Sequence, residues 1–159
     1  DALWVGDCNA SGHLISPLLY QRFAQDPARR LARVCREAGA EVFYHASEDQ
    51  PALLALQADA GASVLSVGPG LPLQDAREAV GCRVCLCGNV DPIAVLARGT
   101  PEEVRQAVET TVADISRAGG HLLNSGEMVP RDTPEANLRA FVEAGRQAWQ
   151  AQDRAAGTP

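Results

Sequence analysis

The chain has 159 residues, 46% of them hydrophobic, so it is long enough for one domain with a buried core. Fourteen basic and twenty acidic residues give a net charge of -6, and the basic residues are scattered through helical stretches such as ARRLARVCREAG, which argues against nucleic-acid binding. No apolar run approaches the roughly 18 to 20 residues of a membrane span, and the first residues, DALWVGD, lack the pattern of a signal peptide. We therefore expect no membrane segment and a cytoplasmic protein.

Short apolar runs alternate along the chain with longer segments of helical period. In chain order, the sequence predicts a strand at residues 2–7, a helix at 16–39, a strand at 41–46, a helix at 50–61, a strand at 63–68, a helix at 73–81, a strand at 83–90, a helix at 100–120, a strand at 121–126 and a helix at 133–150. Ser16 followed by Pro17 is typical of a helix start, and Thr100 with Glu103 has the spacing of a capping box. Residues 1–150 are expected to form one domain and residues 151–159 a flexible tail.

Strands that alternate with helices predict right-handed βαβ units and a parallel sheet. About five such units are present, whereas a closed eight-stranded barrel typically takes about 250 residues. The sequence therefore predicts an α/β fold that is either the C-terminal part of a longer protein or an open half barrel. A half barrel would need a partner to cover the exposed edges of its sheet.

In such folds, ligands bind beyond the carboxyl ends of the strands. The residues at these positions are Asp7, Cys8, Asn9, His45, Ser47, Glu48, Gly68, Cys87, Asn89, Asp91 and the segment 124–131. We expect them to form one rim, on which Glu127 lies.

Five cysteines are present, and three of them lie in the stretch GCRVCLC (residues 81–87). Neighbours along one strand are poorly placed for a disulfide, so reduced thiols are favoured over a disulfide framework. Cys82 and Cys85 are expected to be small buried hydrophobic residues.

Three stretches carry a resemblance to a known family: GDCNASGHLISPLLYQRFA (residues 6–24), GCRVCLCGNVDPIAVLARGTPEEV (81–104) and LLNSGEMVPRDTPEANLRAFVEAG (122–145). They resemble the C-terminal half of the uroporphyrinogen decarboxylase superfamily, and most of all its branch of methylcobamide:coenzyme M and related corrinoid methyltransferases. The resemblance implies a (β/α)8 TIM barrel, of which this chain supplies roughly the last five units. The absent first half would carry the residues that hold a tetrapyrrole in the decarboxylases.

The two branches of this superfamily use the rim differently. In the methyltransferase branch, a His-x-Cys strand end and a Cys after the last strand hold zinc, which activates a thiol. Here His45 is kept, Ser47 stands where the first Cys is expected, and Glu127 stands where the second is expected. In the decarboxylase branch, a His that meets a substrate carboxylate stands at the position of Glu127, and a glutamate there would repel a polycarboxylate.

Imidazole and carboxylate are both competent metal ligands, so His45 and Glu127 can still contribute to a site for zinc or another divalent metal. Cys87 or Cys8 would add a thiolate. The alternative is that a local hydrogen bond holds His45 and no metal binds.

The resemblance implies three catalytic residues, Asp7, His45 and Glu127. It also implies four side chains that contact substrate: Asn89, Asp91, Asn124 and Arg131. Asn89 and Asp91 are equally consistent with turn and helix-cap roles, and Arg131 is consistent with an ion pair inside its loop. His13 and His121 are expected to be structural.

The function implied by the resemblance is corrinoid-dependent methyl transfer, with methylcobalamin as co-substrate and a small molecule or a corrinoid protein as partner. A first alternative is a uroporphyrinogen III decarboxylase, which needs no cofactor. A second alternative is a non-catalytic binding or assembly domain. We expect the chain alone to be inactive and to pair with a missing N-terminal half or with a second copy of itself.

Overall fold

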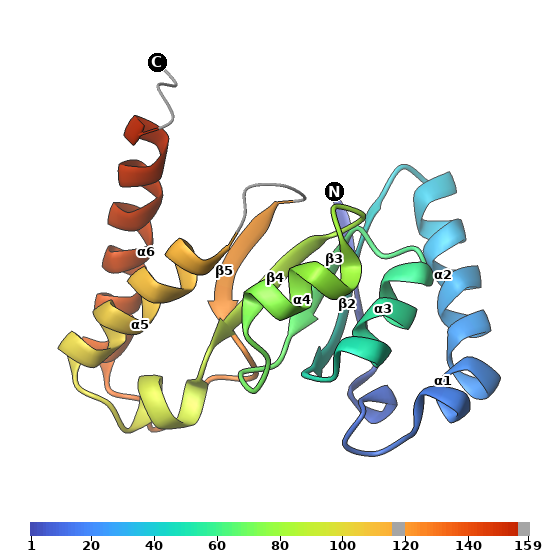
Figure 1. The fold of residues 1–159 in the computed structure, drawn as a ribbon, viewed down its shortest axis with the longest axis horizontal. Coiled ribbons are helices and arrows are strands. Elements are labelled where there is room, and N and C mark those ends of the chain that lie inside the picture. The colour runs from blue at the N-terminus through green and yellow to red at the C-terminus, as the bar shows by residue number, and fades with distance from the viewer. Residues whose placement is uncertain (116–119, 156–159) are drawn as a thin grey trace.

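The computed structural model describes residues 1–115 and 120–155. Five parallel strands lie side by side in chain order: β1 (Ala2–Gly6), β2 (Glu41–Glu48), β3 (Val64–Val67), β4 (Cys85–Val90) and β5 (His121–Ser125). A helical segment follows each strand (Figure 1). This α/β arrangement is that of a partial (β/α)8 barrel of five βα units, which confirms the fold class predicted from the sequence.

The helical segments are η1 (Cys8–Ala10), α1 (Pro17–Phe23), α2 (Gln25–Glu37), α3 (Pro51–Asp59), α4 (Leu73–Val80), the π-helix η2 (Pro92–Ala97), α5 (Pro101–Asp114) and α6 (Glu135–Ala155). Among the described residues, no helix is both long enough and apolar enough to cross a membrane.

The two faces of the sheet differ, as strand β2 shows. Its buried side chains alternate with half-exposed ones because successive side chains of a strand point to opposite faces. Tyr44 and Ala46 pack in the core beneath the helices, whereas Phe43 and His45 lie on the opposite face. The helix-covered face is therefore the outer wall of the partial barrel, and the other face is its interior.

The two largest hydrophobic clusters pack helices on the sheet. The larger one includes Leu54 of α3, Leu65 of β3 and Leu86 of β4. The second joins α5 and α6 through residues such as Val108 and Ala144. Burial of these side chains fixes the strand order and therefore the positions of the loops that follow the strands.

The predicted helix over residues 16–39 is wrong as one continuous helix, because it is divided into α1 and α2 at Ala24. The cause lies three residues further on. Pro27 has no backbone N–H, and its ring would clash with the carbonyl of Phe23 in a continuous helix. After the break, Pro27 lies in the first turn of α2, where a missing N–H costs little.

Two other helix ends differ from the prediction. The capping box of Thr100 and Glu103 starts α5 as expected, but α5 ends at Asp114, and residues 116–119 of the predicted helix lie outside the described residues. Helix α6 continues to Ala155, so residues 151–155 of the expected tail are helical. The remainder of that tail, residues 156–159, lies outside the described residues.

Candidate functional site

Three side chains with metal-binding atoms meet at the carboxyl ends of the strands. Cys8 follows β1, His45 belongs to β2, and Glu127 lies in the loop after β5. One ligand atom from each lies within 4.8 Å of the other two, and His45 Nε2 is 3.6 Å from Glu127 Oε1. Among the described residues, this is the one group of three such side chains found so close together.

The charge of Glu127 is set by its neighbours. Burial acts to raise the pKa of the Glu127 carboxyl, but the nearby Ser47 hydroxyl and the His45 ring outweigh it and lower this pKa below its ordinary value. The Met128 amide adds to the effect by donating to Glu127 Oε1 at 2.8 Å. Glu127 is therefore ionised at neutral pH and can accept a cation.

The pKa of the Cys8 thiol is shifted in the opposite direction, upward. Burial and the negative charge of Glu127 raise the pKa of the Cys8 thiol. Cys8 is therefore protonated at neutral pH, and its Sγ is 3.9 Å from the His45 carbonyl oxygen. A cation bound beside Cys8 would lower the pKa of the Cys8 thiol, because positive charge favours the thiolate.

His45 has an aromatic neighbour from the adjacent strand. The parallel pairing of β1 with β2 places Gly6 beside His45, and the Trp4 ring lies against the imidazole with ring centroids 5.2 Å apart. A Cβ atom at Gly6 would lie 2.5 Å from the Trp4 ring. The glycine therefore leaves the space that lets Trp4 lie across β1 toward His45.

A buried carboxylate anchors the segment that follows Cys8. Glu48 is fully buried and accepts hydrogen bonds from the backbone N–H groups of Gly12, Asp49 and Gln50, at 2.9, 3.1 and 2.8 Å. The amide of Gln57 donates to the same carboxylate at 3.4 Å. Glu48 was predicted only as a rim residue. Its role is to tie the Cys8 segment to the end of β2 and the start of α3.

Asp7 is held by a chain of two tyrosines. Tyr44 donates to Asp7 Oδ2 at 2.5 Å, and the hydroxyl of Tyr20 donates to that of Tyr44 at 3.3 Å. Burial raises the pKa of Tyr20 to about 12 and that of Tyr44 further still, so both remain uncharged donors. One oxygen of the predicted catalytic Asp7 is thus committed to holding the strand end in place.

Asn89 and Asp91 do not belong to the group of three, and both side chains bond to backbone. The Asn89 amide donates to the carbonyl oxygens of Gly68 and Leu71 at 2.8 and 2.6 Å. Asp91 caps η2 by accepting from the amides of Ile93 and Ala94 at 2.7 and 2.8 Å. The sequence left two roles open for these residues, ligand contact or backbone support. The hydrogen bonds support a turn role for Asn89 and a helix-cap role for Asp91.

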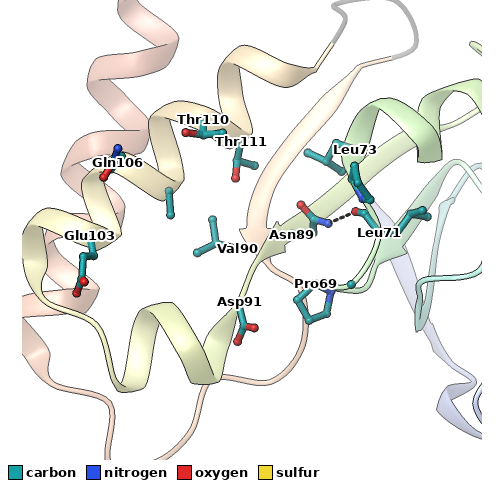
Figure 2. A pocket seen from close by; sticks show the side chains of 13 residues that line it. Pro69, Leu71, Leu73, Asn89, Val90, Asp91, Glu103, Gln106, Thr110 and Thr111 are labelled. Carbon is teal, nitrogen blue, oxygen red and sulfur yellow. Dashed lines mark hydrogen bonds between the residues drawn. The ribbon is translucent and has the colours of Figure 1, made fainter.

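The same two residues line a cavity on the outer side of the sheet, which we call the outer pocket. It has a volume of about 540 Å³ and is bordered by the loop after β3, the end of β4 and helix α5 (Figure 2). Figure 2 shows Gln106, Thr110 and Thr111 on α5, and Asn89 at the end of β4 with its amide directed at Leu71. The outer pocket therefore lies on the helix side of β4, whereas His45 lies on the interior face.

Cys87 and Asn124 lie beside the group of three without joining it. Cys87 is buried, burial raises the pKa of its thiol, and the Asn124 amide donates to its Sγ at 3.4 Å. The sequence offered Cys87, or alternatively Cys8, as the thiol beside His45 and Glu127, and the thiol that lies in the group is that of Cys8. Asn124 remains a candidate for a substrate contact.

The other predicted polar residues lie elsewhere. Arg131 is exposed, and no ion pair is recorded for it within the described residues. His121 is buried and its Nε2 lies 2.7 Å from the Gly88 carbonyl, consistent with a structural role, and His13 pairs with Asp49 at 2.9 Å. The expectation that Cys82 is buried is wrong, because Cys82 is exposed on the turn after α4.

The group of three opens into a cavity of about 500 Å³, here called the mouth pocket. Its lining residues are Trp4, Cys8, Phe43, His45, Ser66, Cys87, Asn124, Ser125, Glu127 and Met128. This set combines metal-binding atoms, aromatic rings and one amide. The mouth pocket can therefore hold a cation and a small, partly apolar molecule at the same time.

A family model and curated relatives agree on one family. A family model described as "Uroporphyrinogen decarboxylase (URO-D)" matches residues 1–148. The uroporphyrinogen decarboxylase of Methylococcus capsulatus is 31% identical over 141 residues, 89% of this chain and 38% of that protein. That of Methylobacillus flagellatus is 38% identical over 88 residues, 55% of this chain and 24% of that protein. The solved structure of a methyltransferase from Methanosarcina mazei matches with a TM-score of 0.78 at 22% identity, over 94% of this chain and 42% of that one. The chain thus spans less than half the length of these relatives.

Proposed function

Because the chain belongs to the uroporphyrinogen decarboxylase family, we propose that it forms the metal-binding part of a methyltransferase-like enzyme. The reaction is the transfer of a methyl group between a corrinoid, such as methylcobalamin, and a small acceptor or donor. One observation carries the proposal, namely the convergence of the Cys8 thiol, the His45 imidazole and the Glu127 carboxylate within 4.8 Å.

The chemistry of these three donors fits a divalent metal. Thiolate, imidazole and carboxylate are the ligand types of zinc, and a catalytic zinc site usually has three protein ligands and one open position. Cys8, His45 and Glu127 would hold the ion, and zinc is favoured because a thiolate suits it better than it suits magnesium or calcium. When bound, such an ion acts as a Lewis acid that lowers the pKa of a substrate thiol.

Three residues in or near the mouth pocket have supporting roles in this proposal. Trp4 packs against the His45 ring and restrains its orientation. Glu48 fixes the segment after Cys8 through its bond from Gly12 N–H. Asn124, which lines the mouth pocket, offers a polar contact to a bound substrate. Trp4 and Glu48 thus position the ligand group, and Asn124 orients the substrate beside it.

Decarboxylation of uroporphyrinogen is the second candidate function. The observation in its favour is sequence identity, because the curated relatives with 31% and 38% identity are named uroporphyrinogen decarboxylase. The observation against it is Glu127, whose negative charge lies in the mouth pocket and would repel a polycarboxylate. A decarboxylase would also leave the group of three without a role.

A partner is part of the proposal. Strands β1 and β5 form the two edges of the sheet, and each pairs with a neighbour on one side only. Large apolar side chains are exposed on both edge strands, including Trp4 on β1 and Leu122 on β5. We propose that further βα units, from an N-terminal half of the protein or from a second copy of the chain, cover these edges. Five free cysteines suit a reducing compartment, in keeping with a cytoplasmic location.

Metal analysis of the purified chain tests the proposed function. We expect elemental mass spectrometry to find zinc or another divalent metal at about one ion per chain, in keeping with one three-ligand site. The double variant His45→Ala, Glu127→Gln and the single variant Cys8→Ser should lose it. Cys82→Ser is the matched control, because it removes an exposed thiol outside the group. Equal metal content in all four proteins, or none in any, would contradict the proposal.

A further inference from the structure

The side of α5 that lines the outer pocket is mostly polar. Its lining residues are Glu103, Gln106, Ala107, Thr110 and Thr111, which recur at spacings of three and four residues and therefore share one side of the helix (Figure 2). Side chains that pack against a neighbouring element are normally apolar. This polar side therefore suits water or a polar ligand better than it suits direct packing against α4.

The inner wall of the outer pocket is apolar and lies where two parts of the core meet. Leu71 and Leu73 belong to the larger hydrophobic cluster, whereas Val90 belongs to the cluster shared by α5 and α6. All three side chains are buried. A ligand in the outer pocket can therefore rest an apolar body on the seam between the two clusters.

Three polar residues of the outer pocket use only part of their side chains to hold the fold. Asn89 uses its amide nitrogen for the loop after β3, Asp91 uses Oδ1 for the amides of η2, and Glu103 uses Oε2 for Thr100. Within the described part of the chain, Asn89 Oδ1, Asp91 Oδ2 and Glu103 Oε1 accept no hydrogen bond. The outer pocket thus presents acceptor oxygens on side chains that are already held in position.

The two carboxylates of the outer pocket have no cationic partner among the described residues. The sequence contains no lysine, and no arginine lines the outer pocket. The N-terminus of α5 carries about half a positive charge, which offsets only part of the charge of Asp91 and Glu103. The outer pocket therefore favours a ligand that donates hydrogen bonds and carries positive charge.

We propose that the outer pocket binds a small aliphatic amine, whose ammonium group meets Asp91 and Glu103 and whose carbon chain lies on the apolar seam. The volume of about 540 Å³ is within the usual range of small-molecule pockets. Gln106, Thr110 and Thr111 offer hydrogen bonds to a second polar end. The proposed amine site is distinct from the group of three, because it lies on the helix side of β4, and it does not depend on methyl transfer.

Three matched four-carbon compounds test the charge preference on the purified chain. They are 1,4-diaminobutane, 1,4-butanediol and butanedioate, which share a carbon chain and differ in the charge of their ends. Isothermal titration calorimetry at low salt gives the dissociation constant of each. We expect the diamine to bind about tenfold more tightly than the diol, as two exposed ion pairs allow, and butanedioate not to bind.

Two charge-removing variants test the position of the amine. Asp91→Asn and Glu103→Gln preserve the helix caps, because asparagine is a good N-cap residue and glutamine is accepted in a capping box. We expect each to weaken diamine binding about threefold and the double variant about tenfold, with no change for the diol. Glu109→Gln is the matched control, because it removes the same charge from an exposed position of α5 outside the outer pocket.

A third variant blocks the outer pocket without changing its charge. Ala107→Leu places a larger side chain among the lining residues and should abolish diamine binding. Ala113→Leu, at an exposed position of the same helix, is its control and should bind like the wild type. Urea denaturation of each variant checks that the fold is retained.

The inference would be overturned if the diamine did not bind, or if the diol bound as tightly. Equal weakening by Glu109→Gln and by Asp91→Asn would overturn it too, since the diamine would then follow the net acidity of the surface. The double variant His45→Ala, Glu127→Gln should bind the diamine like the wild type. Loss of binding in that variant would place the amine in the mouth pocket and contradict the proposed site.

Discussion

The carboxyl ends of β2 and β4 both carry polar side chains, but these side chains are used differently. At the end of β4, Asn89 and Asp91 are bonded to backbone groups of the adjoining loop and of η2. At the end of β2, Glu48 takes the backbone-bonding role, which leaves His45 on the interior face with its ring directed to Glu127. A polar residue at a strand end is thus free for chemistry only where another residue satisfies the local backbone.

The largest effect on stability is expected at Glu48, which bonds to the backbone at the end of β2. Glu48→Ala leaves the N–H groups of Gly12, Asp49 and Gln50 without their acceptor in a partly buried place. We expect a loss of about 3 kcal/mol in the free energy of unfolding, measured by urea denaturation. A loss below about 1 kcal/mol would show that water replaces the carboxylate and that Glu48 is not an anchor.

The second-largest effect on stability is expected at Asp91, which bonds to the backbone of η2 at the end of β4. Asp91→Ala removes the N-cap of η2, and we expect it to cost about 1 kcal/mol in the free energy of unfolding, with Asp91→Asn close to the wild type. Metal affinity, measured by competition with a chromophoric chelator, should be unchanged. A drop in metal affinity would place Asp91 in the functional site after all.

The pH dependence of stability tests the charge of Glu127. Because the folded pKa of Glu127 is lowered, its contribution to stability is present above the ordinary value of 4.5 and is lost as the pH falls through the lower folded pKa. The difference in unfolding free energy between the metal-free wild type and Glu127→Gln should therefore shrink from pH 7 toward pH 3. A difference that stays constant over this range would mean that the folded structure does not favour the carboxylate.

The smallest effect concerns the contact between Trp4 and His45. Gly6→Ala places a methyl group where the Trp4 ring lies, and because Trp4 is largely exposed its ring can turn away. We expect a stability change within about 0.5 kcal/mol but a clear change in the NMR shifts of the His45 ring protons. Unchanged shifts would indicate that the two rings are not in contact in solution.

Local pattern was sufficient to predict the five strands and the order of the elements. The alternation of short apolar runs with helical segments is a local signal, and a parallel βα arrangement follows from it. The break at Ala24 was missed although Pro27 marks it, because the apolar period continues through the proline. The sequence period could also have shown that Glu48 is buried, since it shares a face of β2 with Tyr44 and Ala46.

The functional group was predicted in part. His45 and Glu127 were expected together, and the structure brings them to 3.6 Å. The choice of Cys87 over Cys8 could not be settled from the sequence, because it depends on the register of β1 beside β2 and on the reach of the loop after β5. Both are set by long-range packing and sheet curvature, which no short stretch of sequence encodes.

The absorption spectrum of the cobalt(II)-loaded chain tests the central claim most directly, because a cysteine thiolate bound to cobalt gives a sulfur-to-metal charge-transfer band. We expect this band in the wild type and in Cys87→Ser, and its loss in Cys8→Ser. A band that persists in Cys8→Ser and disappears in Cys87→Ser would contradict the assignment of Cys8, His45 and Glu127 as one ligand set.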